Sequence, residues 1–159
     1  MRCCHRKDEQ RIQSLYLLLS SILGVVCLSM PLGYFCTTNG ERVSELFNLW
    51  LRMSDSGEHV FTPWALFALL VIITTLTFLD IFLFTRRALQ MRVLTLCMIL
   101  LVGYYALLGF IVYQAHSNGA TYTPSITAAF PFICIVLDYL AFRGILKDEL
   151  LVRSLDRLR

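Results

Sequence analysis

Charged side chains are the scarcest feature of this sequence. Only 16% of its 159 residues are Asp, Glu, Lys or Arg, whereas 57% are hydrophobic. Soluble domains average about 25% charged and about 45–50% apolar residues, so the composition indicates a membrane protein. The net charge of +3 is too small to suggest nucleic acid as a partner.

Motifs for catalysis and metal binding are also missing. The three histidines, His5, His59 and His116, belong to no H-x-x-x-H or H-x-x-E pair. The six cysteines contain no C-x-x-C pair, and the adjacent Cys3 and Cys4 lack a second ligand pair at zinc spacing. We therefore expect a protein that is not an enzyme and that holds neither a metal nor another cofactor.

Long apolar stretches are present instead, and four of them contain one charge or none. A membrane-spanning helix needs about 20 apolar residues, and each stretch is close to that length. Helices are expected because lipid leaves the backbone no other hydrogen-bond partners, and the stretches lack the alternation of barrel strands. The prediction is an all-α, polytopic integral membrane protein, a single four-transmembrane-helix bundle covering 1–159. Its spans are expected at about 13–35, 63–84, 93–114 and 124–142. Pro31 and Pro131 lie inside the first and fourth spans and are expected to kink them, which frees the carbonyls of Cys27 and Thr127.

Basic residues predict how these spans are oriented. Twelve of the 14 lysines and arginines lie in the N-terminal segment, in the loop 85–92 or in the tail 143–159. The remaining two, Arg42 and Arg52, lie in the loop 36–62. Because cytoplasmic segments carry the excess of Lys and Arg, both termini are predicted to be cytoplasmic. Four spans, an even number, place both termini on one side as well.

Asp80 and Asp138 are the only ionisable side chains within the predicted spans. Each lies four residues before the end of its apolar stretch, about 6 Å from the cytoplasmic boundary. The basic residues expected at this level are Arg11, Arg87, Arg92 and Arg143. The preferred interpretation is an ion pair that orients the helices, and the alternative is a proton or cation relay.

The outer loop 36–62 contains the sequence "ERVSELFNLWLRM", in which apolar residues recur at helical spacing. These residues are Val43, Leu46, Phe47, Trp50 and Leu51. The spacing predicts an amphipathic helix, with Trp50 on the face that contacts the outer membrane surface. A lid over a cavity and a docking site for a partner are the alternatives.

The cytoplasmic tail 143–159 also has a helical pattern. Leu151, Leu155 and Leu158 form one stripe, while Arg153 and Arg157 add positive charge near its end. A helix is predicted from about Lys147 to Leu158, an amphipathic C-terminal helix that contacts the membrane surface or a partner protein.

Both ends of the chain resemble a known family. "QRIQSLYLLL" (Gln10–Leu19) and "RGILKDELLVRSLDRLR" (Arg143–Arg159) are similar to a Bacteroidetes family of small four-helix membrane proteins, domain of unknown function 4293. The resemblance implies a bacterial inner-membrane location and four spans, but it implies no activity. Residues 1–9 precede the point at which members of the family begin.

Two functions lead at this stage, and an enzyme acting on lipid ranks third because the sequence has no recognisable nucleophile or metal set. The first is a non-enzymatic accessory or scaffold subunit, which contacts the lipid bilayer and a membrane-protein partner or a second copy of itself. The alternative is a small carrier or channel component that uses Asp80 and Asp138. A water-lined cavity that reaches both acids would favour the carrier. A dry, tightly packed bundle would favour the scaffold.

Overall fold

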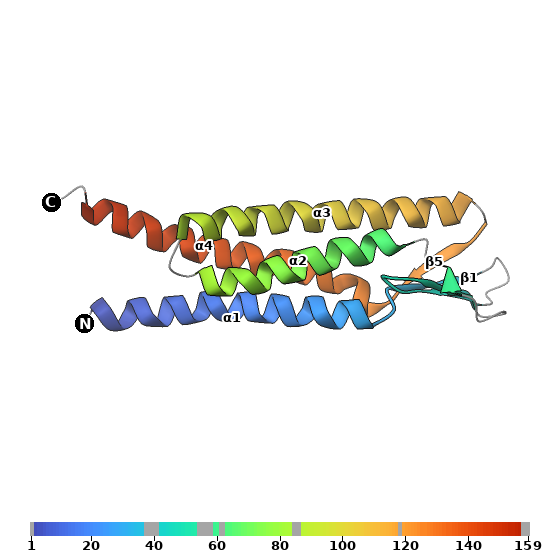
Figure 1. Ribbon diagram of the computed structural model, residues 1–159, viewed down its shortest axis with the longest axis horizontal. Coiled ribbons are helices and arrows are strands. Elements are labelled where there is room, and N and C mark those ends of the chain that lie inside the picture. The colour runs from blue at the N-terminus through green and yellow to red at the C-terminus, as the bar shows by residue number, and fades with distance from the viewer. Residues whose placement is uncertain are drawn as a thin grey trace.

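The computed structural model describes residues 2–36, 42–53, 59–60, 63–83, 87–117 and 119–156. Within its helices and strands, the side chains of residues 2–11, 13, 43, 59–60, 87, 148–149 and 151–156 fall outside this description. The described residues form four α-helices: α1 (Arg2–Ser29), α2 (Trp64–Phe82), α3 (Arg87–Ser117) and α4 (Phe130–Asp156). The helices run alternately up and down in one elongated bundle (Figure 1). Helix α1 packs on α2 and α4, and α3 packs on the same two helices.

Three helical segments among the described residues are long and apolar enough to cross a membrane. They are Trp64–Phe82, Ala88–Ser117 and Ile126–Lys147, and α1 contributes a shorter apolar segment, Ser14–Ser29. The prediction of a mostly helical, multi-pass membrane protein is therefore supported. The start of α1 and the end of α4 lie at the same end of the bundle (Figure 1). An even number of spans predicts this arrangement.

A small antiparallel sheet covers the opposite end of the bundle. Its strands are β1 (Gly33–Cys36), β2 (Arg42–Leu46), β3 (Leu51–Met53), β4 (His59–Val60) and β5 (Thr121–Pro124), in the order β4-β3-β2-β1-β5. The sheet joins the α1–α2 connection to the α3–α4 connection. Strand β1 belongs to the first connection and pairs both with β2 and with β5 of the second.

The predicted amphipathic helix at 43–51 is wrong, because this segment forms β2, a tight turn and β3. The turn is closed by a 2.9 Å hydrogen bond from the Phe47 N–H to the Trp50 carbonyl. Leu46 pairs with Leu51 across the hairpin, so apolar residues that fit a helical stripe also fit this hairpin. The neighbouring strand β1 supplies backbone partners from outside the segment, and this contact outweighs the local helical pattern.

Pro31 ends the first helix, whereas the sequence predicted a kinked span that continues to Phe35. Proline lacks an N–H and its ring clashes with the carbonyl four residues earlier. Helix α1 stops at Ser29, and the Leu32 N–H turns to the Leu46 carbonyl at 2.7 Å. The apolar residues that follow Pro31 therefore enter the sheet.

The fourth helix also begins later and ends later than predicted. A short 3₁₀ helix, η2 (Ile126–Ala129), precedes α4, so Pro131 lies at the start of α4 instead of kinking its middle. Helix α4 then continues without a break to Asp156, which confirms a helical tail but joins it directly to the span. The side chains of Leu151, Arg153 and Leu155, and the whole of Arg157 and Leu158, fall outside the described residues.

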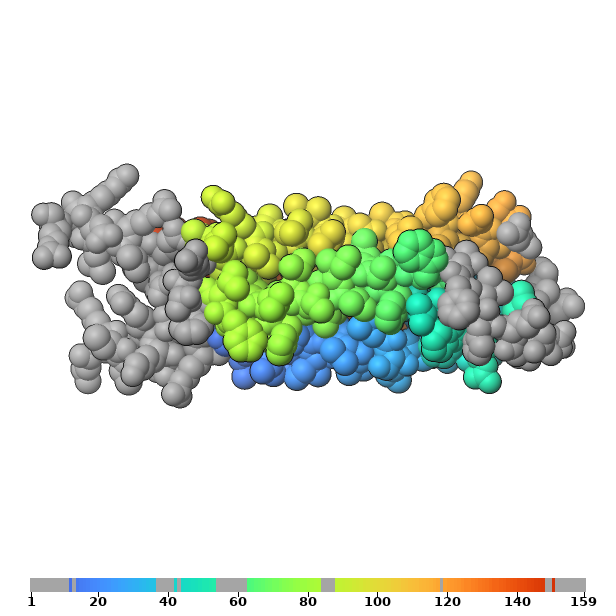
Figure 2. All heavy atoms as spheres, viewed as in Figure 1, coloured from blue at the N-terminus to red at the C-terminus, as the bar shows by residue number. Residues whose placement is uncertain are grey.

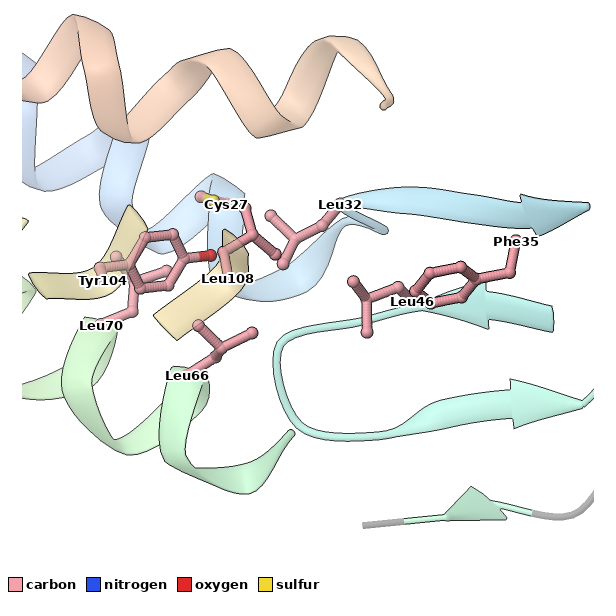
Figure 3. Packing of buried hydrophobic residues seen from close by; sticks show 8 residues of the cluster. All are labelled: Cys27, Leu32, Phe35, Leu46, Leu66, Leu70, Tyr104 and Leu108. Atoms are coloured by element: carbon pink, nitrogen blue, oxygen red, sulfur yellow. The ribbon is translucent and has the colours of Figure 1, made fainter. Parts of the chain in front are cut away.

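An apolar cluster attaches the sheet to the bundle (Figure 3). Leu32, Phe35 and Leu46 from the sheet side pack with residues of three helices: Cys27 of α1, Leu66 and Leu70 of α2, and Tyr104 and Leu108 of α3. The space-filling view shows the resulting rod, with α1, α2 and α3 side by side and sheet residues at one end (Figure 2). The sheet is thus packed onto the helix ends instead of forming a separate domain.

Candidate functional site

Two carboxyl groups lie inside the bundle. Asp80 of α2 and Asp138 of α4 are both 0% exposed, and their charges are close enough to interact. None of their four carboxylate oxygens has a hydrogen-bond partner among the described residues. Burying an unpaired carboxylate is costly, so two such groups side by side mark this region as the candidate site.

Asp138 lies in an apolar segment that ends with basic residues. The segment runs from Ile126 to Lys147, and Arg143 and Lys147 follow the acid by five and nine residues. At about 1.5 Å per residue, Arg143 lies about 8 Å beyond Asp138 along α4, so the expected position near the cytoplasmic boundary stays a prediction. Asp80, two residues before the end of α2, is brought to the same region by the packing of α2 in the bundle.

The predicted ion pairs are not formed with the two described arginines. Arg92 and Arg143 are both exposed, whereas the acids face the interior and have no hydrogen-bond partner there. The side chains of Arg11 and Arg87 fall outside the described residues. The arginines thus point away from the bundle and the acids point into it, although the sequence predicted the same membrane level for both.

Polar groups from every helix surround the acid pair. The Thr77 hydroxyl of α2 donates to Cys97 Sγ of α3 at 3.8 Å, and both acids act electrostatically on Cys97. Cys134 Sγ of α4 donates to the Ser20 carbonyl of α1 at 3.5 Å. The Ser20 side chain approaches Asp138 as a hydrogen-bond donor would, but the contact falls outside standard hydrogen-bond geometry. We call Asp80, Asp138 and these four neighbours the acid-pair site.

The described neighbours of the acid pair offer hydroxyls and thiols. In the part of the chain that the structure describes, no group of three His, Cys, Asp or Glu side chains is arranged to hold a metal ion. The arrangement suits the binding of a proton, which needs no fixed coordination shell. Sequence analysis identified the two acids but not Ser20, Thr77, Cys97 or Cys134 as their neighbours, because these residues are common in apolar helices.

Asn48 forms a second buried polar contact, between the sheet and the bundle. This side chain is 0% exposed, and its Nδ2 donates to the Cys27 carbonyl at 2.7 Å. Its Oδ1 accepts a 2.6 Å hydrogen bond from the Tyr104 hydroxyl of α3. Sequence reasoning missed Asn48, although Pro31 predicted that the Cys27 carbonyl would lose its helical partner.

Aromatic residues strengthen the same end of the molecule. Trp50, predicted to lie on the membrane surface, is half-buried in the hairpin turn with its ring centroid 5.7 Å from that of Phe47. The Tyr122 hydroxyl donates to the Leu32 carbonyl at 3.0 Å. Burial raises the pKa of the Tyr122 phenol to about 12, so it stays protonated and keeps this hydrogen bond at physiological pH.

A crevice of about 590 Å³ lies between α1 and α2, and its lining includes Ser21, Val25, Thr74 and Phe78. Its hydroxyls are occupied, because Ser21 donates to the Leu18 carbonyl and Thr74 to the Leu70 carbonyl. Neither Asp80 nor Asp138 lines this crevice. The acid pair is therefore enclosed on this side.

One comparison with known proteins covers nearly the whole chain. The model of a family described as a domain of unknown function, DUF4293, matches residues 10–158. This match confirms the resemblance found at both ends of the sequence. No curated protein matches the chain.

Proposed function

The chain belongs to the DUF4293 family, and we propose that this member is a small carrier or channel component in which the Asp80–Asp138 pair binds and releases a proton. In this proposal, all four helices cross a bacterial inner membrane and both termini are cytoplasmic. The shorter apolar segment of α1 crosses together with the polar residues that precede it. The sheet then lies on the outer surface.

The single observation that carries this proposal is that the buried acids have no hydrogen-bond partner among the described residues. Four buried carboxylate oxygens without a hydrogen bond would cost several kcal/mol for each charged group. A proton bound by the pair removes this cost without requiring an arginine or a metal ion.

Protonation of this site would also change how the helices pack. When both acids are charged, they repel each other, and a bound proton relieves this repulsion. A charge change at one buried site can thus bias the arrangement of two helices. This coupling is what a proton-driven carrier requires.

The accessory or scaffold function remains the second candidate, and the enclosure of the site favours it. Both acids are 0% exposed, and neither lines the crevice between α1 and α2. In a scaffold, a permanently protonated pair would only be part of the packing of the bundle. The C-terminal tail would then contact a membrane-protein partner or a second copy of the chain.

The experiment compares wild-type protein with Asp80→Asn, Asp138→Asn and the double variant in proteoliposomes. Infrared spectroscopy should show a protonated-carboxyl band that changes with pH and is altered in each variant. A pH-sensitive dye inside the vesicles should show proton uptake that the variants lose. Glu45→Gln, a change in the sheet outside the bundle, serves as the control and should behave like wild type.

The outcomes separate the candidates. A carboxyl band without proton uptake would favour the scaffold, in which the pair is structural.

Thermal unfolding tests the ion-pair interpretation independently. Asparagine at position 80 or 138 should leave the thermal unfolding midpoint unchanged or raise it, because the substitution removes a buried acid that has no partner among the described residues. A clear fall in both single variants would instead indicate a charged partner for the acids.

A further inference from the structure

The buried side chains of α3 form one line along the interior of the bundle. They are at most 6% exposed, recur at intervals of three and four residues, and comprise Leu94, Cys97, Leu101, Tyr104 and Leu108. This spacing places them on one helix face. Cys97 marks the level of the acid pair, because both Asp80 and Asp138 act on it electrostatically. The line therefore shows what covers the acids toward each end of the bundle.

Toward the sheet, two successive apolar clusters cover the acid pair. The first contains Leu101 and buried residues of α2 and α4. The second attaches the sheet to the bundle and includes Tyr104 and Leu108 (Figure 3). Cys97 lies 20 residues before Ser117, the end of α3, which is about 30 Å along the helix. A proton from this end would have to pass both clusters and the sheet.

Toward the end where both termini lie (Figure 1), one apolar cluster covers the acids among the residues that the structure describes. Its buried members come from three helices and are Leu17, Leu94, Ala141 and Ile145. We call this cluster the Leu94 layer. Gln90, a polar residue that is 6% exposed, lies one helical turn beyond Leu94. Cys97 is ten residues from Arg87, the start of α3, or about 15 Å. This path is half as long as the path from the sheet.

Helix α2 places its acid near the same end. Asp80 lies two residues before Phe82, the last residue of α2, and 16 residues after Trp64, the first. At about 1.5 Å per residue, these separations are about 3 Å and about 24 Å along the helix. Two helices thus agree that the acid pair lies closer to the termini than to the sheet.

We propose that the acid pair exchanges its proton through the Leu94 layer, with the side of the membrane on which both termini lie. This inference rests on the proposed binding and release of a proton by the pair. The Leu94 side chain separates the Gln90 amide from the level of the acids. When the layer opens, the amide on one side and the carboxyl groups on the other supply the polar partners that a water molecule needs. The acid pair then gives its proton to this water, or takes one from it.

The test follows the carboxyl band of the acid pair by infrared spectroscopy after proteoliposomes are transferred into heavy water. Asp80→Asn and Asp138→Asn identify the band, and its shift reports replacement of the carboxyl proton by deuterium. Leu94→Ala and Leu17→Ala open the layer from two different helices. Leu101→Ala is the matched control, because it truncates an equally buried leucine of α3 on the sheet side of Cys97. Leu94→Met keeps the layer filled.

We expect the carboxyl proton of Leu94→Ala to exchange about tenfold faster than that of wild type, because the cavity admits water next to the acids. Leu17→Ala should also exchange faster, and it tests the layer independently if Leu94→Ala does not fold. Leu101→Ala and Leu94→Met should exchange at the wild-type rate. The thermal midpoints of Leu94→Ala and Leu101→Ala should fall by similar amounts, since each loses one buried leucine. A difference between their exchange rates then reflects position and not stability.

Other exchange rates would overturn the inference while leaving proton binding by the pair intact. Faster exchange in Leu101→Ala than in Leu94→Ala would place the route on the sheet side. Equal acceleration in these two variants would show general loosening of the bundle. Wild-type rates in both Leu94→Ala and Leu17→Ala would show that the layer does not limit exchange. A wild-type protein without the carboxyl band would instead contradict the proposed function, and the route with it.

Discussion

The Asn48 side chain donates a 2.7 Å hydrogen bond to the Cys27 carbonyl, the carbonyl whose helical partner Pro31 removes. The same amide accepts a 2.6 Å hydrogen bond from Tyr104. One buried side chain thus joins the end of α1, the hairpin and α3. It also satisfies the backbone at the point where the chain leaves the bundle.

Replacing Asn48 with Ala should loosen the junction between the sheet and the bundle. The change leaves the Cys27 carbonyl and the Tyr104 hydroxyl buried without partners, at about 1–3 kcal/mol for each group. We expect a lower thermal midpoint in detergent and faster hydrogen exchange in β1 and β2. Thr75→Ala, which removes an exposed hydroxyl bonded within its own helix, should have little effect.

A double-mutant cycle with Tyr104→Phe separates the two contacts of Asn48. If they act as a unit, the double variant should lose less stability than the two single variants added together. Fully additive losses would show that the Tyr104 hydroxyl and Asn48 stabilise the junction independently.

Gly24 should tolerate no side chain. A Cβ at this position would lie 2.6 Å from Thr74 Oγ1, which is held in place by its bond to the Leu70 carbonyl. Gly24→Ala should therefore push α1 away from α2 and destabilise the bundle by about 1–3 kcal/mol. The measurement is the thermal midpoint in detergent.

Two further variants test this explanation for Gly24. Gly103→Ala, where a Cβ meets nothing within 4 Å, should leave stability unchanged or raise it through helix propensity. Thr74→Ala should restore part of the stability lost in Gly24→Ala. A Gly24→Ala protein as stable as wild type would mean that α1 and α2 can separate at low cost.

The leucines of the tail should bind a surface. Changing Leu151, Leu155 and Leu158 to Ser keeps every charge but removes the stripe. We expect the tail to become sensitive to protease in vesicles and to recover less of any partner protein in pull-downs. Unchanged protection and recovery would show that the basic charge alone is sufficient.

Topology can be tested with reporter fusions. The distribution of Lys and Arg predicts that a fusion at Arg159 is active only with a cytoplasmic reporter, and one after Asn118 only with a periplasmic reporter. Periplasmic activity at Arg159 would contradict the proposed orientation.

The sequence by itself was sufficient for the features that depend on composition along the chain. Apolar length located α2 and α3 well, since a span needs a run of residues without charge whatever its neighbours are. Asp80 and Asp138 could be identified from the sequence because they are the only ionisable residues within the predicted spans. Residues at both ends of the chain identified the family, which the match over residues 10–158 confirms.

Only the tertiary structure decided which residues meet. The segment 42–53 became strands because β1, ending at Cys36, supplied hydrogen-bond partners that the local helical pattern does not reveal. Asp80 and Asp138 share a membrane region with arginines, yet the rotation of each helix turned the acids inward and Arg92 and Arg143 outward. Asn48 acquired its role because Cys27 and Tyr104 approach it from distant parts of the chain. Contacts of this kind depend on how the helices and the sheet pack together, and a linear pattern does not record them.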